Sequence, residues 1–267
     1  LPPTLYRRHC GVRRATRCAP VAPLRMSTSR GSPPSDASRP DGPAIGPEVA
    51  GRPIAELGPG VDATAVARSL GEPARLAAVD ATGLLASEAA TRSPLARVAR
   101  LAAGTLLAPV AQVNLLGPDS QVPVAAFVAP TLGAPGDGGA VDPLAWRTPV
   151  ALAASLCQYV VATHAPLVVD DARDDPLGRA HPAVLAAGLV GYCAVPLRAP
   201  GGSGMPPGTG PVVGSVCVVD TVPRRWTPDD VALLEDLAAG AEAEVARRTV
   251  EHRLRALADA MPLVVWT

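Results

Sequence analysis

The chain has 267 residues, which is enough for one substantial domain with linkers or for two small domains. Its formal net charge is zero, so no overall positive field favours nucleic acid as a partner. Hydrophobic residues make up 48% of the chain, but no run of about 18 uninterrupted apolar residues occurs, and we therefore predict no membrane span.

Residues 1–70 are predicted to be a disordered N-terminal segment. Residues 1–25 contain several arginines and no acidic residue, a composition that organelle transit peptides share. Because the sequence opens on Leu1 and Met26 begins a separate stretch, we expect Met26 to be the true start and residues 1–25 to be upstream translation. The stretch from Met26 to about Gly60 is rich in Ser, Pro and Gly and has too few apolar residues to form a core.

Regular structure is expected from about Arg75 onward. The segment 75–85 is expected to contain a short helix, which Gly83 stops. A second helix begins at Ser93, which is a suitable N-cap before Pro94 at the first helical position. The pattern then predicts strands over 110–116 and 121–128, joined by a Gly-Pro-Asp turn. Pro123 indicates an edge position for the second strand.

The second half of the chain alternates between the two element types. We predict a helix over 151–163, a short buried strand over 167–169, a helix over 175–188, and strands over 190–197 and 212–219. The glycine-rich loop between the last two strands favours an antiparallel hairpin. Consecutive strand pairs with helices grouped between them indicate an α+β layer rather than a doubly wound sheet.

The final helix is the best marked element. Thr227 is its predicted N-cap, Pro228 occupies the first position and Asp230 follows three residues after the cap. Its C-terminal part carries apolar residues at spacings of four, three and four, which are typical of a coiled-coil seam and predict a parallel homodimer. The seam residues are Val250, Leu254, Leu257 and Met261.

Several of these segments resemble the GAF domain family. They are Ser-Leu-Cys-Gln-Tyr-Val-Val at 155–161, Pro-Leu-Val-Val-Asp-Asp-Ala-Arg at 166–173, Gly-Tyr-Cys-Ala-Val-Pro-Leu at 191–197 and Val-Gly-Ser-Val-Cys-Val-Val-Asp at 213–220. They occur in the family's order, and the resemblance covers residues 75–248. It implies a central antiparallel sheet of five or six strands, helices from both ends of the domain on one face, and a cavity closed by loops and a short helix on the other.

The last residues, 254–267, resemble the beginning of a PAS domain. A complete domain of that kind needs roughly another 100 residues, so we predict that 249–267 are a signalling helix and the start of a truncated PAS domain. Proteins with this arrangement are commonly sensor histidine kinases of two-component systems, diguanylate cyclases or metal-dependent serine phosphatases. The resemblance thus implies a cytoplasmic bacterial signalling protein, whose GAF domain senses a small molecule or a redox event and signals to a PAS and output domain.

Cys157, Cys193 and Cys217 are the candidates for redox chemistry, which needs an accessible thiolate and usually a resolving partner. Cys193 and Cys217 would lie almost opposite each other in the predicted hairpin, but a register shift of one residue decides whether they share a face. Cysteine often behaves as a small buried hydrophobe, and we predict such a core role. A GAF-fold enzyme that reduces free methionine sulfoxide, and a dimerisation module that binds nothing, are kept as alternatives.

Cys157, Tyr159, Tyr192 and Cys217 are the predicted ligand-binding residues. Tyr192 would offer its ring for stacking and its hydroxyl for a hydrogen bond, with ordinary core packing as the alternative. We predict no catalytic residue and no metal site, because none of the histidines pairs with a cysteine at the spacing of zinc ligands. The adjacent Cys-His pair that often marks bilin attachment and the polar motif of cyclic-nucleotide-binding members are also not found. The sequence names neither the ligand nor a cofactor.

Overall fold

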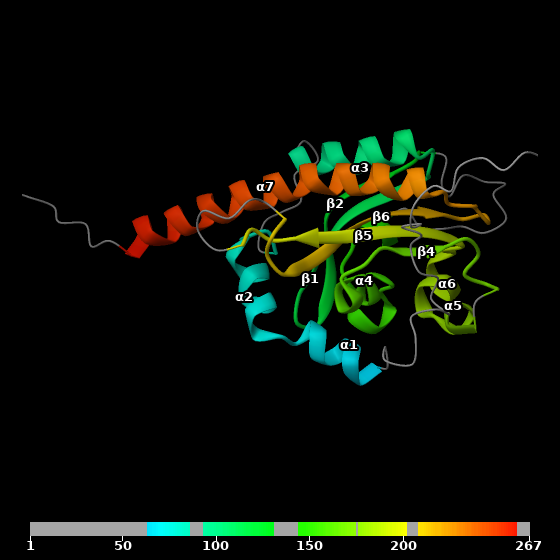
Figure 1. Ribbon diagram of the computed structural model, residues 1–267, viewed down its shortest axis with the longest axis horizontal. Helices are drawn as coiled ribbons and strands as arrows, with labels where there is room; N and C mark the ends of the chain where they lie inside the picture. Colours follow the sequence, from blue (N-terminus) through cyan, green and yellow to red (C-terminus); the bar gives the residue numbers. More distant parts are fainter. Residues whose placement is uncertain (1–62, 86–92, 131–143, 175, 202–207, 261–267) are drawn as a thin grey trace, which may run out of the picture. The chain divides into compact units, whose positions relative to one another are not determined.

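A six-stranded antiparallel sheet is the centre of the part of the chain that the structure, a computed structural model, describes (Figure 1). The described residues are 63–85, 93–130, 144–174, 176–201 and 208–260. The strand order is β3-β2-β1-β6-β5-β4, and the strands are β1 (Val110–Leu116), β2 (Ser120–Val128), β3 (Val150–Ala151), β4 (Leu167–Val169), β5 (Gly191–Arg198) and β6 (Val212–Asp220). Every residue of β1 and β6 is buried, since both faces of the sheet are covered.

Two long helices cover one face of the sheet (Figure 1). They are α3 (Pro94–Thr105) and α7 (Pro228–Ala260), and α2 (Pro73–Ala81) contacts α7 beside them. Small side chains such as Ala99 and Ala241 are fully buried at this interface, so the helices approach the strands closely. The predicted arrangement, with helices from both ends of the domain on one face, is confirmed.

Short elements cover the other face. They are α1 (Ala63–Leu70), α4 (Cys157–Thr163), α5 (Pro176–Ala180), α6 (Pro182–Ala187) and two 3-10 helices, η2 (Ala145–Arg147) and η3 (Leu152–Ala154). Their apolar side chains form a second core with the strands, separate from the core beneath α3 and α7. Among the described helices, none combines the length and the hydrophobicity that a membrane crossing requires.

Helix α1 corrects the prediction of disorder up to residue 70. Val66 and Leu70 are buried in the second core, where α1 packs against α4. A helix of two turns is unstable alone, so packing rather than local propensity explains why it forms. The other predictions for the N-terminal segment, including the start at Met26, fall on residues 1–62, outside the described part.

Both helices predicted in the second half of the domain are divided. The segment 151–163 contains η3 and α4, because Ser155 adopts an extended conformation between them. The segment 175–188 contains α5 and α6, because His181 is extended and caps α6 by accepting the Ala183 amide at Nδ1 (3.2 Å). In both cases a side chain replaces the hydrogen bonds that a continuous helix would have made.

Three terminal contacts place the helices. Ser93 Oγ accepts from the Ala96 amide (3.1 Å), and Thr227 and Asp230 exchange bonds at the start of α7, as the sequence predicted. The buried guanidinium of Arg75 donates to the carbonyls of Leu70 and Leu116, which joins the α1–α2 link to the end of β1.

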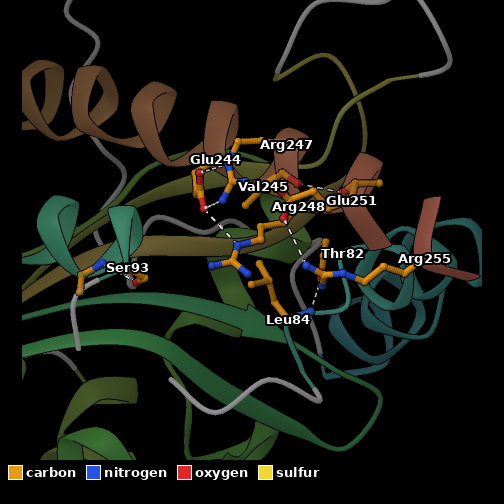
Figure 2. A network of polar contacts seen from close by, with 11 residues as sticks. Thr82, Leu84, Ser93, Glu244, Val245, Arg247, Arg248, Glu251 and Arg255 are labelled. Atoms are coloured by element: carbon orange, nitrogen blue, oxygen red, sulfur yellow. Dashed lines mark hydrogen bonds and ion pairs between the residues drawn. The ribbon is translucent and has the colours of Figure 1, made fainter. Parts of the chain in front are cut away.

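The C-terminal part of α7 extends beyond its core contacts. Thr249 is its last buried residue, and Val250, Leu254 and Leu257 are 56%, 60% and 62% exposed. Figure 2 shows the ion pairs along this part: Arg247 and Arg248 contact Glu244 (2.7 and 3.1 Å), and Arg247 and Arg255 contact Glu251. Pairs of opposite charge three or four residues apart lie on one face of a helix and support it modestly.

Candidate functional site

A cavity of about 240 Å³ lies between the sheet and the short elements of its second face. Fourteen residues line it: Gln112, Gln121, Trp146, Thr148, Val150, Ala154, Ser155, Leu156, Cys157, Pro182, Ala183, Leu189, Tyr192 and Val219. No Asp, Glu, Lys, Arg or His is among these lining residues. The cavity therefore suits an uncharged molecule, because an unpaired buried charge would be costly.

Two polar residues of β1 face the cavity side of the sheet, and one of them, Gln112, lines the cavity. Gln112 and Asn114 alternate with apolar residues, so both side chains face α4 rather than α7. Gln112 donates through Nε2 to the carbonyl of Trp146, which holds the η2 segment against the sheet. Asn114 donates through Nδ2 to Gln112 Oε1 (3.4 Å), so the two amides support each other.

Ser155 positions the start of α4. Its hydroxyl donates to Gln121 Oε1 and accepts from the backbone N–H of Cys157 (3.1 Å). Residues from β2 and from the helix start are thereby joined at the cavity edge. This contact places the Cys157 side chain against the sheet.

Two thiols meet on the same side of the sheet. Cys157 Sγ lies 3.1 Å from the hydroxyl of Tyr192, and both it and Cys217 Sγ contact Asn114 Nδ2, at 3.6 and 3.3 Å. The two cysteines come from the first residue of α4 and the middle of β6. The fold therefore brings two free, buried thiols together on the cavity side of the sheet.

Hydrogen bonding separates the acidities of these thiols. Hydrogen bonding from Cys217 and from the Tyr192 hydroxyl lowers the pKa of Cys157 to about 6 although burial acts in the opposite direction. The same bond to Cys157, together with burial, raises the pKa of Cys217. Cys157 is therefore the thiol of the pair that ionises first.

The register of β5 and β6 separates Cys193 from this pair. Cys193 lies opposite Val218, and Cys217 lies opposite Ala194. Because neighbouring residues of a strand point to opposite faces, Cys193 faces α7 and Cys217 faces α4. Burial raises the pKa of Cys193 to about 12.

The four predicted ligand-binding residues occupy different positions. Cys157 and Tyr192 line the cavity, whereas Cys217 lies beside Cys157 without lining it. Tyr159 belongs to α4 and does not line the cavity; its ring centroid lies 6.3 Å from that of His181. In the described residues, no group of three His, Cys, Asp or Glu side chains is placed to hold a metal ion.

Sequence reasoning missed the amides and the tryptophan of the site. The sequence did mark Gln112 and Asn114, because they are polar residues in an otherwise apolar strand and their spacing of two places them on one face. Trp146 Nε1 and Asn114 Oδ1 are buried without a hydrogen-bond partner within the described part of the chain. Such groups are costly, by about 1–3 kcal/mol each, unless something pairs with them.

The sequence matches the model of the GAF domain over residues 95–245. The chain belongs to the GAF family. The match begins in α3 and ends within α7, so it includes the whole sheet and the cavity of the GAF domain. Helices α1 and α2 precede it.

Solved structures similar to this GAF domain include the GAF domain of PixJ from Thermosynechococcus elongatus in its blue-light-absorbing form. That chain is 13% identical, with a TM-score of 0.44, and the match covers 72% of this chain and 99% of that one. Free methionine-R-sulfoxide reductase from Neisseria meningitidis, in complex with its substrate, is 16% identical with a TM-score of 0.42, and the match covers 67% and 89%. No curated protein matches the sequence. The family assignment rests on the sequence match over 95–245.

Proposed function

We propose that this GAF domain is a sensory module that binds a small uncharged molecule between the sheet and α4. The observation that carries the proposal is the cavity itself, in which the polar groups of Gln112, Gln121 and Tyr192 lie among apolar side chains. A ligand held there would bury apolar surface and bond these polar groups.

The two sides of the cavity suggest the form of the ligand. Gln112, Gln121 and Tyr192 offer amide and hydroxyl groups from the sheet, whereas Leu156 and Leu189 contribute apolar surface from the cover. A compact molecule with one polar edge and an apolar body fits this division. Cys157 would lie close to the polar edge.

The signal would leave through α7. Tyr192 lines the cavity, and its neighbour Cys193 faces α7 on the other side of the same strand. At the end of β5, the backbone N–H of Arg198 donates to Glu242 Oε1 of α7 (2.9 Å). A shift of β5 on ligand binding would therefore reach α7 through direct contacts.

The predicted recipient is the module that follows α7. The resemblance of 254–267 to the beginning of a PAS domain supports a PAS and output domain, such as a histidine kinase, in a cytoplasmic signalling protein. Two copies would pair along the exposed face of α7. A change in the position of α7 would then reach the following module as a rotation of the paired helices or a change in their register.

Native mass spectrometry of the full chain tests the ligand proposal. We expect a population heavier than the chain by one small molecule, which the denatured sample releases. Ala154→Phe, which fills the cavity, should lose this population, whereas Ala232→Phe, at an exposed position of α7, should retain it. Equal retention by the two variants would contradict the cavity as the binding site.

A redox enzyme of the free methionine sulfoxide reductase type is the second candidate. It is favoured by one observation, the thiol of Cys157 at the cavity surface next to a second thiol. NADPH consumption in the presence of thioredoxin reductase, thioredoxin and free methionine sulfoxide tests it. Loss of that consumption in Cys157→Ser, with retention in Cys193→Ser, would support the enzyme over the sensor.

A further inference from the structure

We infer that Cys157 and Cys217 are a peroxide-sensitive thiol pair that closes to a disulfide at the floor of the cavity. This goes beyond the proposed function, because it requires no bound ligand. Both thiols are free and buried, and each contacts the same amide nitrogen of Asn114. The Cys217 thiol donates to Gln112 Oε1 (3.7 Å), the same amide oxygen that Asn114 bonds, so one amide pair holds both sulfurs on this face of the sheet.

The cavity makes the two thiols unequal. Cys157 is among the lining residues, and Cys217 and Cys193 are not. A small uncharged oxidant such as hydrogen peroxide can enter this cavity, and it meets Cys157 first because Cys157 is the cysteine that lines it. Cys217 is then in place to resolve the oxidised sulfur, while Cys193 is separated from both by the sheet.

The surroundings of Cys157 favour the nucleophilic form. The hydroxyl of Tyr192 lies 3.1 Å from Sγ, and Asn114 Nδ2 points to it at 3.6 Å. Donors of this kind stabilise a thiolate inside the protein, where burial alone would suppress it. The low pKa of Cys157, about 6, follows from hydrogen bonding by Cys217 and by Tyr192.

The chemistry has two balanced steps. The Cys157 thiolate attacks one oxygen of the peroxide, the O–O bond breaks, and a sulfenic acid forms while hydroxide leaves and takes up a proton to become water. The sulfur of Cys217 then attacks the sulfenic sulfur, the S–O bond breaks, and the departing hydroxide takes the Cys217 proton. Two thiols are oxidised to one disulfide, and one peroxide is reduced to two waters.

The disulfide would change the cavity. It would join the first residue of α4 to the middle of β6, and Tyr192 would lose its thiol partner. The Ser155 hydroxyl bonds both the Cys157 backbone N–H and Gln121 Oε1. Movement of Cys157 at the helix start would therefore alter the cavity edge. Oxidation would therefore change any occupancy of the cavity without a new ligand.

Peptide mapping of the full chain tests the inference. The reduced protein is treated with a small excess of hydrogen peroxide, quenched with N-ethylmaleimide and digested. We expect a linked peptide that joins Cys157 to Cys217, reversed by dithiothreitol, with Cys193 still alkylated. In Cys217→Ser, dimedone should label Cys157 at least tenfold faster than Cys193, because the sulfenic acid has no resolving thiol.

Cys193→Ser is the matched control, since it removes a buried thiol from the opposite face, and it should form the same disulfide as the wild type. Cys217→Ala repeats the dimedone measurement in case the serine variant does not fold. The inference is overturned if the folded wild type yields no Cys157–Cys217 peptide, or if dimedone labels Cys157 and Cys193 equally. No step of this test involves a ligand. Failure of the thiol pair to form a disulfide can therefore be distinguished from failure of the cavity to bind a small molecule.

Discussion

The thiols of Cys157 and Cys193 are both buried, yet their pKa values depart from the ordinary value in opposite directions. At Cys193 burial dominates and raises the pKa to about 12. At Cys157 the bonds from Cys217 and Tyr192 outweigh burial and lower the pKa to about 6. Local donors rather than depth in the core therefore decide which cysteine is reactive.

Tyr192→Phe tests this balance, because it removes one donor and retains the ring. Labelling of Cys157 by iodoacetamide should increase as the pH rises through about 6, since only the thiolate reacts. Without the hydroxyl, the pKa should rise and labelling at pH 6 should fall roughly threefold, as expected for a bond worth about 1 kcal/mol. Peptide mass spectrometry between pH 5 and 9 measures both profiles.

Tyr159→Phe is the control for that measurement, because Tyr159 lies on the same helix as Cys157 but does not line the cavity. Its labelling profile should coincide with that of the wild type. Coincident profiles for Tyr192→Phe and the wild type would mean that the hydroxyl does not stabilise the thiolate.

At the scale of elements, the turn after α2 is held against α7. Gly83 has a φ of +63°, and a Cβ at this position would lie 2.6 Å from Cδ2 of His252. The side chain of Thr82 stabilises the same turn by donating to the Val79 carbonyl and accepting from the Leu84 amide (2.7 and 3.1 Å). Figure 2 shows this turn with the charged part of α7. Glycine is needed here for its backbone conformation and for its lack of a side chain.

Gly83→Ala should lower the free energy of unfolding by about 1–2 kcal/mol, because it combines an unfavourable φ with a clash. Addition of His252→Ala should recover the steric part and leave the conformational part. Urea unfolding of the single and double variants measures the coupling. Gly104→Ala is the control, because a Cβ there meets nothing within 4 Å and should stabilise α3 by about 0.5–1 kcal/mol. Equal effects at the two glycines would refute the argument for the turn.

At the scale of the whole molecule, the end of α7 presents apolar side chains without a cover. Val250, Leu254 and Leu257 are more than half exposed, and the ion pairs of Glu244 and Glu251 support the helix around them. Met261, the fourth residue of the predicted seam, lies outside the described residues. The pattern supports a parallel dimer, which stays a prediction.

Leu254→Glu with Leu257→Glu should convert a dimeric full chain to a monomer, because each copy would bring two like charges to the seam and the pair would bury four. Sedimentation velocity at high micromolar concentration measures the change. Leu101→Glu, which alters a 47% exposed leucine of α3, should leave the dimer intact. A wild-type chain that sediments as a monomer under these conditions would remove the basis of the dimer.

Local signals were sufficient where an element depends on its own residues. Ser93 and Thr227 mark helix starts because their side chains bond amides three residues away. The apolar run of β1 was recognised in full, since length and turn residues bound it. The division at His181 could have been predicted, because Pro182 disfavours a helical conformation at the residue before it.

The break at Ser155 could not be predicted, because its partner Gln121 lies on a distant strand. The sequence by itself determined the antiparallel hairpin of β5 and β6, the caps of the long helices and the presence of Cys157 and Tyr192 near one site. Only the tertiary structure decided that Cys217, not Cys193, meets Cys157. Side chains alternate with a period of two along a strand, so a slip of one residue reverses the faces, and contacts across the sheet select the register.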